Sequence, residues 1–289
     1  MVVEGKHGRF RINPHDTVIG ASLQRYGEFA EHELMLLGTF LETGQTVCDV
    51  GANIGTHTIF FSKHVGENGS VVAVEAQPGI YDLLRENIDF NDCQNVSALN
   101  AAAGAAPGIL TAPRLDYERD GNFGAFSFRL PDIGKYLPVT AAGDEIQVDV
   151  IPLDSLGLNN CDLIKVDAEG MERDVLIGAA RIIETHRPIL YVENNIKEES
   201  PALIAQITDM NYRAYWHVIS YFRAKNFHAH PDNIFPMPLE LNMLCLPAES
   251  EQEPKGLPFV ANPQQWLPDD IGADEASVHV LLGAAESFG

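Results

Sequence analysis

The sequence has few cysteines, and none of them is placed to bind zinc. Cys48, Cys93, Cys161 and Cys245 are scattered along the chain and form no CxxC pair. Three of them lie in apolar runs that are typical of strands, so we interpret them as small buried hydrophobic residues in a reducing compartment. No apolar run approaches the length of a membrane span, and no signal-peptide pattern is visible. These absences favour a soluble, cytoplasmic protein.

Basic residues are also scarce. The 289 residues include 19 Lys and Arg against 41 Asp and Glu, which gives a net charge of −22. Such a charge argues against a nucleic-acid backbone or an anionic membrane as the main partner. The apolar fraction of 45% is ordinary for a globular protein, and the length suits one large α/β domain with insertions.

Short apolar segments alternate with amphipathic ones along most of the chain. Strands are predicted at Thr46–Val50, Ser70–Val74, Val96–Leu99, Asp162–Val166, Pro188–Val192, Arg213–Val218 and Leu241–Leu246. Helices are predicted at Thr56–Lys63, from Pro78, at Met171–Glu184 and at Pro201–Met210. This alternation predicts an α/β fold, with a seven-stranded, mostly parallel sheet and helices on both faces. No helical segment separates the last two strands, so we expect them to form a terminal antiparallel hairpin.

Other regions depart from this alternation. Residues 1–45 are predicted to form an N-terminal strand at Gly8–Ile12 and a helical cap at Glu28–Leu41. The α/β domain then spans residues 46–248 and contains a β-rich insertion at about 104–150, where Gly, Pro and Ala are frequent. Residues 249–289 form an acidic, proline-containing tail, which we expect to be poorly packed except for a short ordered end at Val278–Leu282.

The strongest functional signal is the glycine loop that follows the first predicted strand of the domain. The strand ends at Asp49, the chain turns at Gly51, and a helix begins near Gly55. In open α/β sheets the ligand lies at such a strand end. A dinucleotide site requires G-x-G-x-x-G, whose middle glycine makes room for a pyrophosphate. Asn53 occupies that position here, which favours S-adenosylmethionine because this cofactor has no pyrophosphate.

Acidic residues end three other predicted strands. Glu75 ends the second strand, where a carboxylate can accept both ribose hydroxyls of the cofactor, and it strengthens the interpretation of the loop. Asp167 and Glu193 follow the fourth and fifth strands and should lie side by side. They could form a substrate-hydroxyl site or a divalent-metal site, and we expect no metal. The dipole of a helix favours acids near its N-terminus, a role that is considered for Glu169 and Glu172 and preferred for Glu172.

A hydroxyl nucleophile benefits from a general base. The catalytic candidates are Asp167, Glu193 and His57, which lies just inside the first helix of the domain. His217 is a further histidine, for which packing is the favoured interpretation. Asn122 and Ser127 of the insertion are placed where they could contact substrate.

Several ordered motifs resemble the FkbM family of methyltransferases. They are D-V-G-A-N-I-G at 49–55, N-A-A-A-G at 100–104, L-D-S-L at 153–156, K-V-D-A-E-G-M-E at 165–172 and R-P-I-L-Y-V-E at 187–193. The resemblance covers roughly residues 25–250. It implies a Rossmann-like class I methyltransferase fold, S-adenosylmethionine as cofactor, and O-methylation of a hydroxyl on a small-molecule acceptor such as a sugar or polyketide.

The resemblance also implies roles for single residues. Asp49, Gly51, Asn53 and Gly55 would line the methionine and ribose of the cofactor, and Glu75 would bind the ribose. Ala101 and Ala102 would face the adenine. Asp167 would lie near the methionine amine and the acceptor.

Two other functions are weighed against this one. An NAD-dependent oxidoreductase needs the G-x-G-x-x-G pattern, which is missing. A non-catalytic small-molecule-binding protein would not need Asp49, Gly51, Glu75 and Asp167 together. The sequence leaves open the identity of the acceptor and whether the protein is a homo-oligomer.

Overall fold

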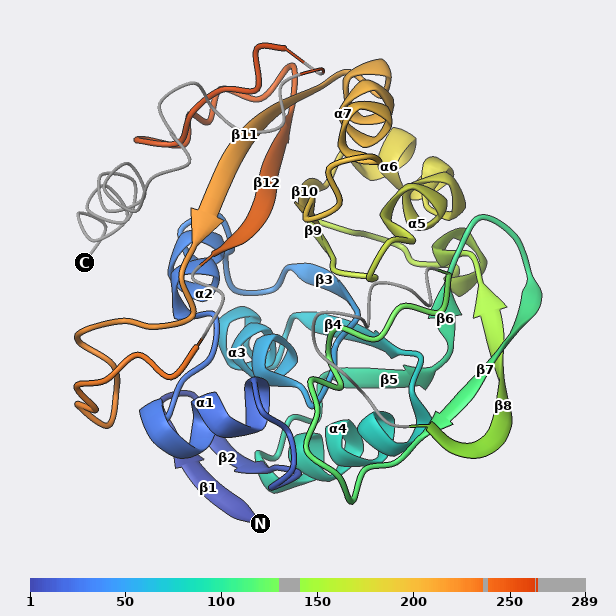
Figure 1. Ribbon diagram of the computed structural model, residues 1–289. Helices are drawn as coiled ribbons and strands as arrows, with labels where there is room; N and C mark the ends of the chain where they lie inside the picture. Colours follow the sequence, from blue (N-terminus) through green and yellow to red (C-terminus); the bar gives the residue numbers. More distant parts are fainter. Residues whose placement is uncertain (130–140, 236–238, 263, 265–289) are drawn as a thin grey trace.

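The computed structural model describes residues 1–129, 141–235, 239–262 and 264. Its centre is a seven-stranded sheet with the strand order β11-β12-β10-β9-β3-β4-β5 (Figure 1). The strands are β3 (Thr46–Val50), β4 (Ser70–Glu75), β5 (Val96–Asn100), β9 (Leu163–Val166), β10 (Ile189–Glu193), β11 (Tyr212–Ile219) and β12 (Glu240–Pro247). The strands from β10 to β5 pair in parallel, and β12 is antiparallel to both β10 and β11. The predicted mostly parallel sheet with a terminal antiparallel hairpin is therefore confirmed.

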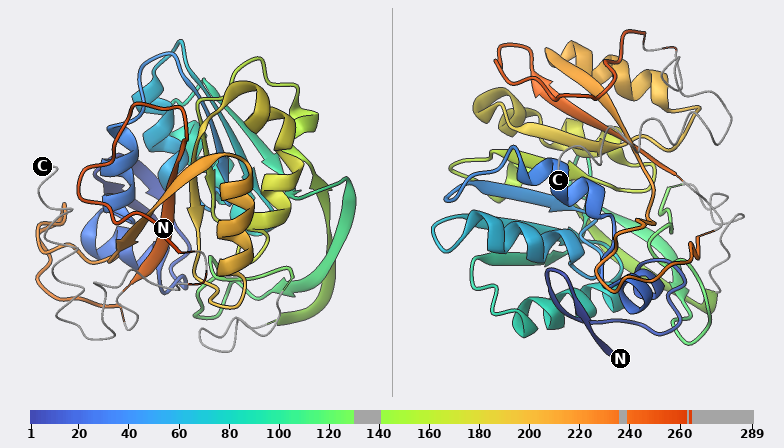
Figure 2. Two further views of the ribbon diagram at one scale, coloured as in Figure 1. Left: turned by 90° about the horizontal axis from the view of Figure 1, so that it is seen from above. Right: turned by 90° about the vertical axis from the view of Figure 1, so that its left-hand side faces the viewer.

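Helices cover both faces of this sheet (Figure 2). One face carries α2 (Glu31–Gly38), α3 (Thr56–Val65) and α4 (Pro78–Phe90), and the other carries α5 (Glu172–Gly178), α6 (Ala180–His186) and α7 (Ser200–Asp209). The alternation of side chains along each strand produces the two layers. In β3, Val47 packs with Leu37 and Phe61 on one face, whereas Cys48 and Val50 belong to the core on the other.

The predicted helix Met171–Glu184 is divided into α5 and α6. The carboxylate of Asp154, in the short 3-10 helix Leu153–Leu156, accepts hydrogen bonds from the backbone N–H groups of Arg181 and Ile182, both at 2.9 Å. This carboxylate satisfies donors in the first turn of α6, so a second helix can begin there.

The N-terminal region is more structured than predicted. It contains a hairpin of β1 (Val2–Gly5) and β2 (Gly8–Arg11), followed by α1 (Ile19–Tyr26). Helix α1 ends at Gly27, whose φ of 69° gives a left-handed C-cap. The predicted helix Glu28–Leu41 is shortened to α2, which begins at Glu31 and ends at Gly38.

The insertion between β5 and β9 is β-rich. It forms a three-stranded sheet of β6 (Ala102–Ala103), β7 (Gly108–Leu115) and β8 (Ala141–Ile151), and the β7–β8 hairpin projects at the right of Figure 1. Residues 116–129 follow β7 and approach the end of β4. There the side-chain amide of Gln77 donates to the carbonyl of Phe123 at 2.7 Å.

Part of the predicted tail packs against the outer strand of the sheet. The backbone N–H of Trp216 donates to Pro258 O at 2.8 Å, and that of Val260 donates to Ala214 O at 2.9 Å. Residues 249–262 thus differ from the poorly packed tail that we expected, because they satisfy the free edge of β11. The expected ordered end at Val278–Leu282 lies outside the described residues. In the described part of the chain no helix is long and apolar enough to cross a membrane.

Candidate cofactor and acceptor site

A cavity of about 900 Å³ opens at the carboxyl ends of β3, β4, β9 and β10. This is the edge where open α/β sheets bind ligands, at the point where the strand order reverses. The cavity has two halves. The half beside β3 and β4 is lined by the predicted cofactor residues Gly51, Asn53, Glu75, Ala101 and Ala102. The half beside β9, β10 and β12 is lined by the acidic residues Asp167, Glu169, Glu193 and Glu240.

The glycine loop owes its shape to a close approach within the protein. Gly51 has a φ of 72°, and a Cβ at this position would lie 1.8 Å from the carbonyl oxygen of Asp167. Glycine is therefore required so that the loops after β3 and β9 can meet. Asn53 also has a positive φ, of 50°, and its side-chain oxygen accepts the N–H of Ile54 at 2.8 Å.

Glu75 is held by the backbone on both sides of its carboxylate. One oxygen accepts the N–H of Asn53 at 2.9 Å and the other accepts the N–H of Gln77 at 2.8 Å. Each oxygen keeps acceptor capacity on the side of the cavity, as a ribose diol requires. Burial raises the pKa of Glu75 to about 7, against the lowering effect of the two N–H groups.

The residues present fit S-adenosylmethionine. Glu75 supplies the acceptor for the ribose, and the small side chains of Ala101 and Ala102 leave room for a flat adenine on the neighbouring wall. Asn53 contributes an amide at the position where a pyrophosphate would need open space.

Two predicted cofactor residues do not line the cavity. Asp49 is completely buried beneath the loop, where it accepts the hydroxyl of Thr58 at 2.6 Å. Gly55, with a φ of 93°, caps the N-terminus of α3. Both residues lie on the side of the loop that faces away from the cavity, where they contact α3 and stabilise the loop.

Lys165 connects the loop to the acidic half of the cavity. Its Nζ lies 3.2 Å from Asp167 Oδ2, 3.1 Å from Gly51 O and 3.6 Å from Asp49 Oδ1. Burial disfavours the charge of Lys165, but Asp167 and Asp49 outweigh it and raise the pKa of its ammonium above the usual value. The sequence signal for this residue was a single charge in an otherwise apolar central strand.

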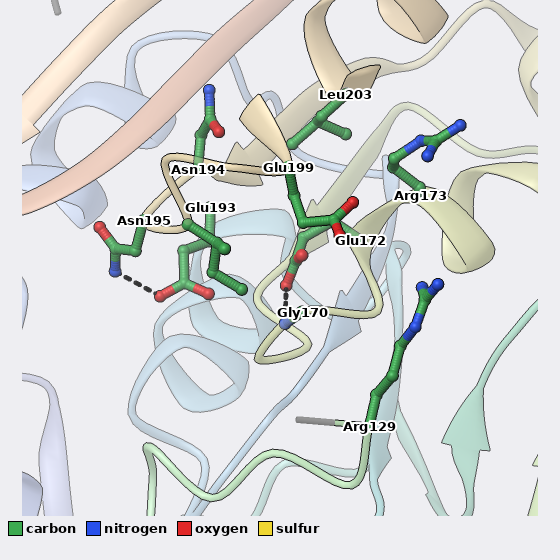
Figure 3. A pocket seen from close by; sticks show the side chains of 10 residues that line it. Arg129, Gly170, Glu172, Arg173, Glu193, Asn194, Asn195, Glu199 and Leu203 are labelled. Carbon is green, nitrogen blue, oxygen red and sulfur yellow. Dashed lines mark hydrogen bonds between the residues drawn. The ribbon is translucent and has the colours of Figure 1, made fainter. Parts of the chain in front are cut away.

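The acidic half brings Asp167 and Glu193 together, as the sequence predicted, and adds Glu169. Carboxylate oxygens of these three residues lie within 4.8 Å of one another, a spacing that could hold a metal ion. Glu193 is 6% exposed, and one of its oxygens accepts the amide of Asn195 at 2.6 Å (Figure 3). The prediction of no metal stays a prediction.

Glu169 and Glu172 have different roles, and the helix-terminus role was preferred for Glu172 alone. Glu172 turns back and accepts the N–H groups of Ala168 and Gly170, at 3.2 and 2.9 Å (Figure 3 shows the second). Glu169 has a left-handed φ of 48° and lines the cavity. The left-handed turn could not be read from the sequence, because glutamate rarely adopts it.

Burial raises the pKa values of Glu169, Glu193 and Glu240 well above the usual range. The negative charges of neighbouring carboxylates raise them further. Among the described residues, these three glutamates form the acidic face opposite the cofactor half.

His57 lines the cavity and is held by a residue outside the predicted domain. Its Nε2 lies 2.9 Å from Glu33 Oε2 in α2, and the amide of Asn242 donates to Glu33 Oε1 at 3.1 Å. Burial raises the pKa of Glu33 to about 8 and lowers that of His57 to about 4, so the pair carries no net charge at neutral pH. Glu33 could not be predicted from the sequence, because nothing in this short helix distinguishes a buried acid from an exposed one.

Other candidates are placed clearly. His217 is buried and lies 2.8 Å from the hydroxyl of Tyr191, which agrees with the packing role. Asn122 lines the cavity, and Ser127 does not. Phe29, Tyr221 and Phe235, which the sequence did not single out, form an aromatic wall of the cavity.

The fold and the cleft define a Rossmann-like α/β protein built to bind a nucleoside-containing cofactor. The family model described as "Methyltransferase FkbM domain" matches residues 49–227, and the chain belongs to this family. S-adenosylmethionine is the cofactor of the family. The predicted family, fold class and cofactor are therefore confirmed.

Individual relatives are more distant. The chain is 31% identical over 116 residues to a probable cobalt-precorrin-6B C(15)-methyltransferase of Sulfolobus acidocaldarius, over 39% of this chain and 56% of the relative. It is 27% identical over 144 residues to Methyltransferase 1 of Beauveria bassiana, over 46% and 57% respectively. The chain thus spans little more than half the length of these curated relatives. Among solved structures, an FkbM methyltransferase of Methylobacillus flagellatus matches with 16% identity and a TM-score of 0.44, over 72% of this chain and 45% of that one.

Proposed function

We propose that the protein transfers a methyl group from S-adenosylmethionine to a hydroxyl group of a small molecule, such as a sugar or a polyketide. The observation that carries the proposal is one continuous cavity with two halves. Glu75 marks the cofactor half, and Asp167 lies where this half meets the acidic half. The family match favours this function over the NAD-dependent oxidoreductase that we weighed against it.

When bound, S-adenosylmethionine supplies an already activated methyl group. The protein then has to position the acceptor and remove its proton. We assign proton removal to Asp167, because its backbone N–H donates to Val50 O at 3.1 Å, beside the glycine loop. Lys165 holds one carboxylate oxygen, and the second is left for the acceptor hydroxyl. Glu193 and His57 line the same cavity, but Nε2 of His57 is already bonded to Glu33.

Cofactor binding is the first test. In calorimetry we expect S-adenosylhomocysteine to bind the wild type and NAD not to bind. Glu75→Gln should weaken binding by about 10- to 100-fold, because hydrogen bonds to a charged acceptor contribute about 1.5–3 kcal/mol. Glu184→Gln, on the exposed face of α6, is the matched control and should bind as the wild type does. A folded wild type that fails to bind S-adenosylhomocysteine would refute the proposal.

The role of Asp167 is tested by turnover. With tritiated S-adenosylmethionine and a panel of hydroxyl-bearing small molecules, the first acceptor that the wild type methylates is taken as the substrate. Asp167→Ala should lower kcat by about 100-fold, the usual contribution of a positioned base. Normal turnover of Asp167→Ala would show that another group takes the proton.

A further inference from the structure

Three glutamates of the acidic half have no cationic partner among the residues that the structure describes. No Lys, Arg or His lies within ion-pair distance of Glu169, Glu193 or Glu240 in the part of the chain that the structure describes. Lys165 is the buried cation of the cavity, and it is already placed between Asp49 and Asp167. Lys197 lies on the cavity rim and is exposed.

Glu193 shows most clearly that a partner is missing. Its side chain is 94% buried, as its exposed fraction of 6% implies, and it lines the cavity. The amide of Asn195 takes one oxygen, and the second has no hydrogen-bond donor among the described residues (Figure 3). This second oxygen belongs to a residue that lines the cavity, so an ammonium group bound there could donate to it.

An aromatic wall adjoins these carboxylates. Tyr221 lies close enough to Glu240 for each to shift the pKa of the other, and Phe29 stacks on Tyr221 with ring centroids 4.9 Å apart and an interplanar angle of 24°. Phe235 meets Tyr221 edge-on at 5.4 Å. All three rings line the cavity. Aromatic faces beside carboxylates form the usual binding environment for an ammonium group.

These three acids lie outside the cofactor half. Glu75 is the carboxylate of that half, and Asp167, which Lys165 already partners, lies at its boundary. Glu169, Glu193 and Glu240 remain on the acceptor side. Burial and mutual repulsion raise the pKa values of these three carboxyl groups, and a cation bound between them would favour their ionised form.

We propose that the methyl acceptor is a hydroxylated amine, an amino sugar or amino alcohol in chemical class, whose protonated nitrogen binds between Glu169, Glu193 and Glu240 against the wall of Phe29 and Tyr221. The inference rests on the proposed function, in which the hydroxyl of the same molecule faces Asp167. It adds the charge of the acceptor, which the family match does not provide.

Matched ligand pairs test the charge. The protein saturated with S-adenosylhomocysteine, in EDTA, is titrated with glucosamine and glucose, and separately with tetramethylammonium and its neutral near-isostere tert-butanol. Ligand-observed NMR should show at least one cation binding about tenfold or more tightly than its neutral partner. Equal binding within both pairs, or no binding of either cation, would overturn the inference. S-adenosylhomocysteine binding without this preference would leave the proposed function standing.

Isosteric variants test the location. Glu193→Gln and Glu169→Gln should each weaken cation binding by about tenfold and leave the affinity for S-adenosylhomocysteine unchanged within about twofold. Glu184→Gln is again the control. A second titration, with Mn²⁺ and without EDTA, separates an organic cation from a metal. Tight Mn²⁺ binding that requires Glu193 and excludes both organic cations would replace the amine site with a metal site.

Discussion

Gly51 illustrates how one residue joins two strands at the site. Two separate constraints apply to it: a φ of 72° and the carbonyl oxygen of Asp167, which would lie 1.8 Å from any Cβ. Gly44 shares the first constraint, with a φ of 92°, but has open space around it. An alanine at Gly44 would therefore introduce backbone strain alone, whereas an alanine at Gly51 would introduce both strain and a steric clash.

We expect Gly44→Ala to lower the free energy of unfolding by about 1 kcal/mol, the strain of a left-handed alanine. Gly51→Ala should cost several times as much, because the loops after β3 and β9 must also move apart. Urea denaturation of both variants measures the difference, and calorimetry with S-adenosylhomocysteine should show weaker binding for Gly51→Ala alone. Equal losses of stability would mean that the loops already have room to separate.

Residue roles at the site were only partly predictable. Glu75, Asp167 and Glu193 follow strands, and strand ends meet at one edge of a parallel sheet, so their placement in one cavity was predicted. The burial of Asp49, the exposure of Glu169 to the cavity and the Glu33–His57 contact were not. Each depends on a backbone turn or on packing between segments distant in sequence, which local patterns do not encode.

At the scale of elements, the segment 249–262 covers an otherwise free strand edge. Its backbone exchanges hydrogen bonds with Ala214 and Trp216 of β11. Side chains add to this contact, since Arg187 pairs with Glu249 at 2.7 Å and Arg213 pairs with Glu253. The glutamates of both ion pairs are exposed to solvent, and exposed ion pairs contribute little to stability. The backbone hydrogen bonds should therefore provide most of the stabilisation.

A chain ending at residue 248 should therefore melt at a lower temperature than one ending at residue 264, which retains the segment. It should also self-associate, because an uncovered strand edge can pair with another chain. Differential scanning calorimetry and size-exclusion chromatography with light scattering make the comparison. Identical melting temperatures and identical masses would show that β11 does not need its cover.

For the whole molecule, buried acids and histidines determine how stability depends on pH. Burial raises the pKa of Glu75 to about 7 and that of Glu33 to about 8, above their ordinary value of about 4.3. Between about pH 4.3 and these raised pKa values the folded protein binds more protons than the unfolded chain, so stability falls as pH rises across this range. Burial lowers the pKa of His57 to about 4 and that of His217 to about 3, so these two histidines make an opposite contribution, which is lost as pH drops below about 6.5.

We expect the melting temperature of the ligand-free protein to decline as pH rises from about 5 to about 8, because the buried acids with raised pKa values outnumber the two buried histidines. Scanning calorimetry in buffers of equal ionic strength measures the profile. The variant Glu33→Gln, which resembles the protonated acid, should decline less steeply above pH 7. A melting temperature that stays constant or rises from pH 6.5 to 9 would contradict the assignment of these buried acids.

The sequence by itself determined the order of strands and helices, the glycine loop, the cofactor and the family. It could do so because hydrophobic periodicity and turn residues are local properties, and because parallel strands bring their carboxyl ends to one edge. Only the tertiary structure decided which residues border the cavity. The cavity brings together Lys165 and Glu169 from one segment, Phe29 from a second, and Tyr221 and Glu240 from others. Burial and the neighbouring carboxylates raise the pKa values of Glu169 and Glu240.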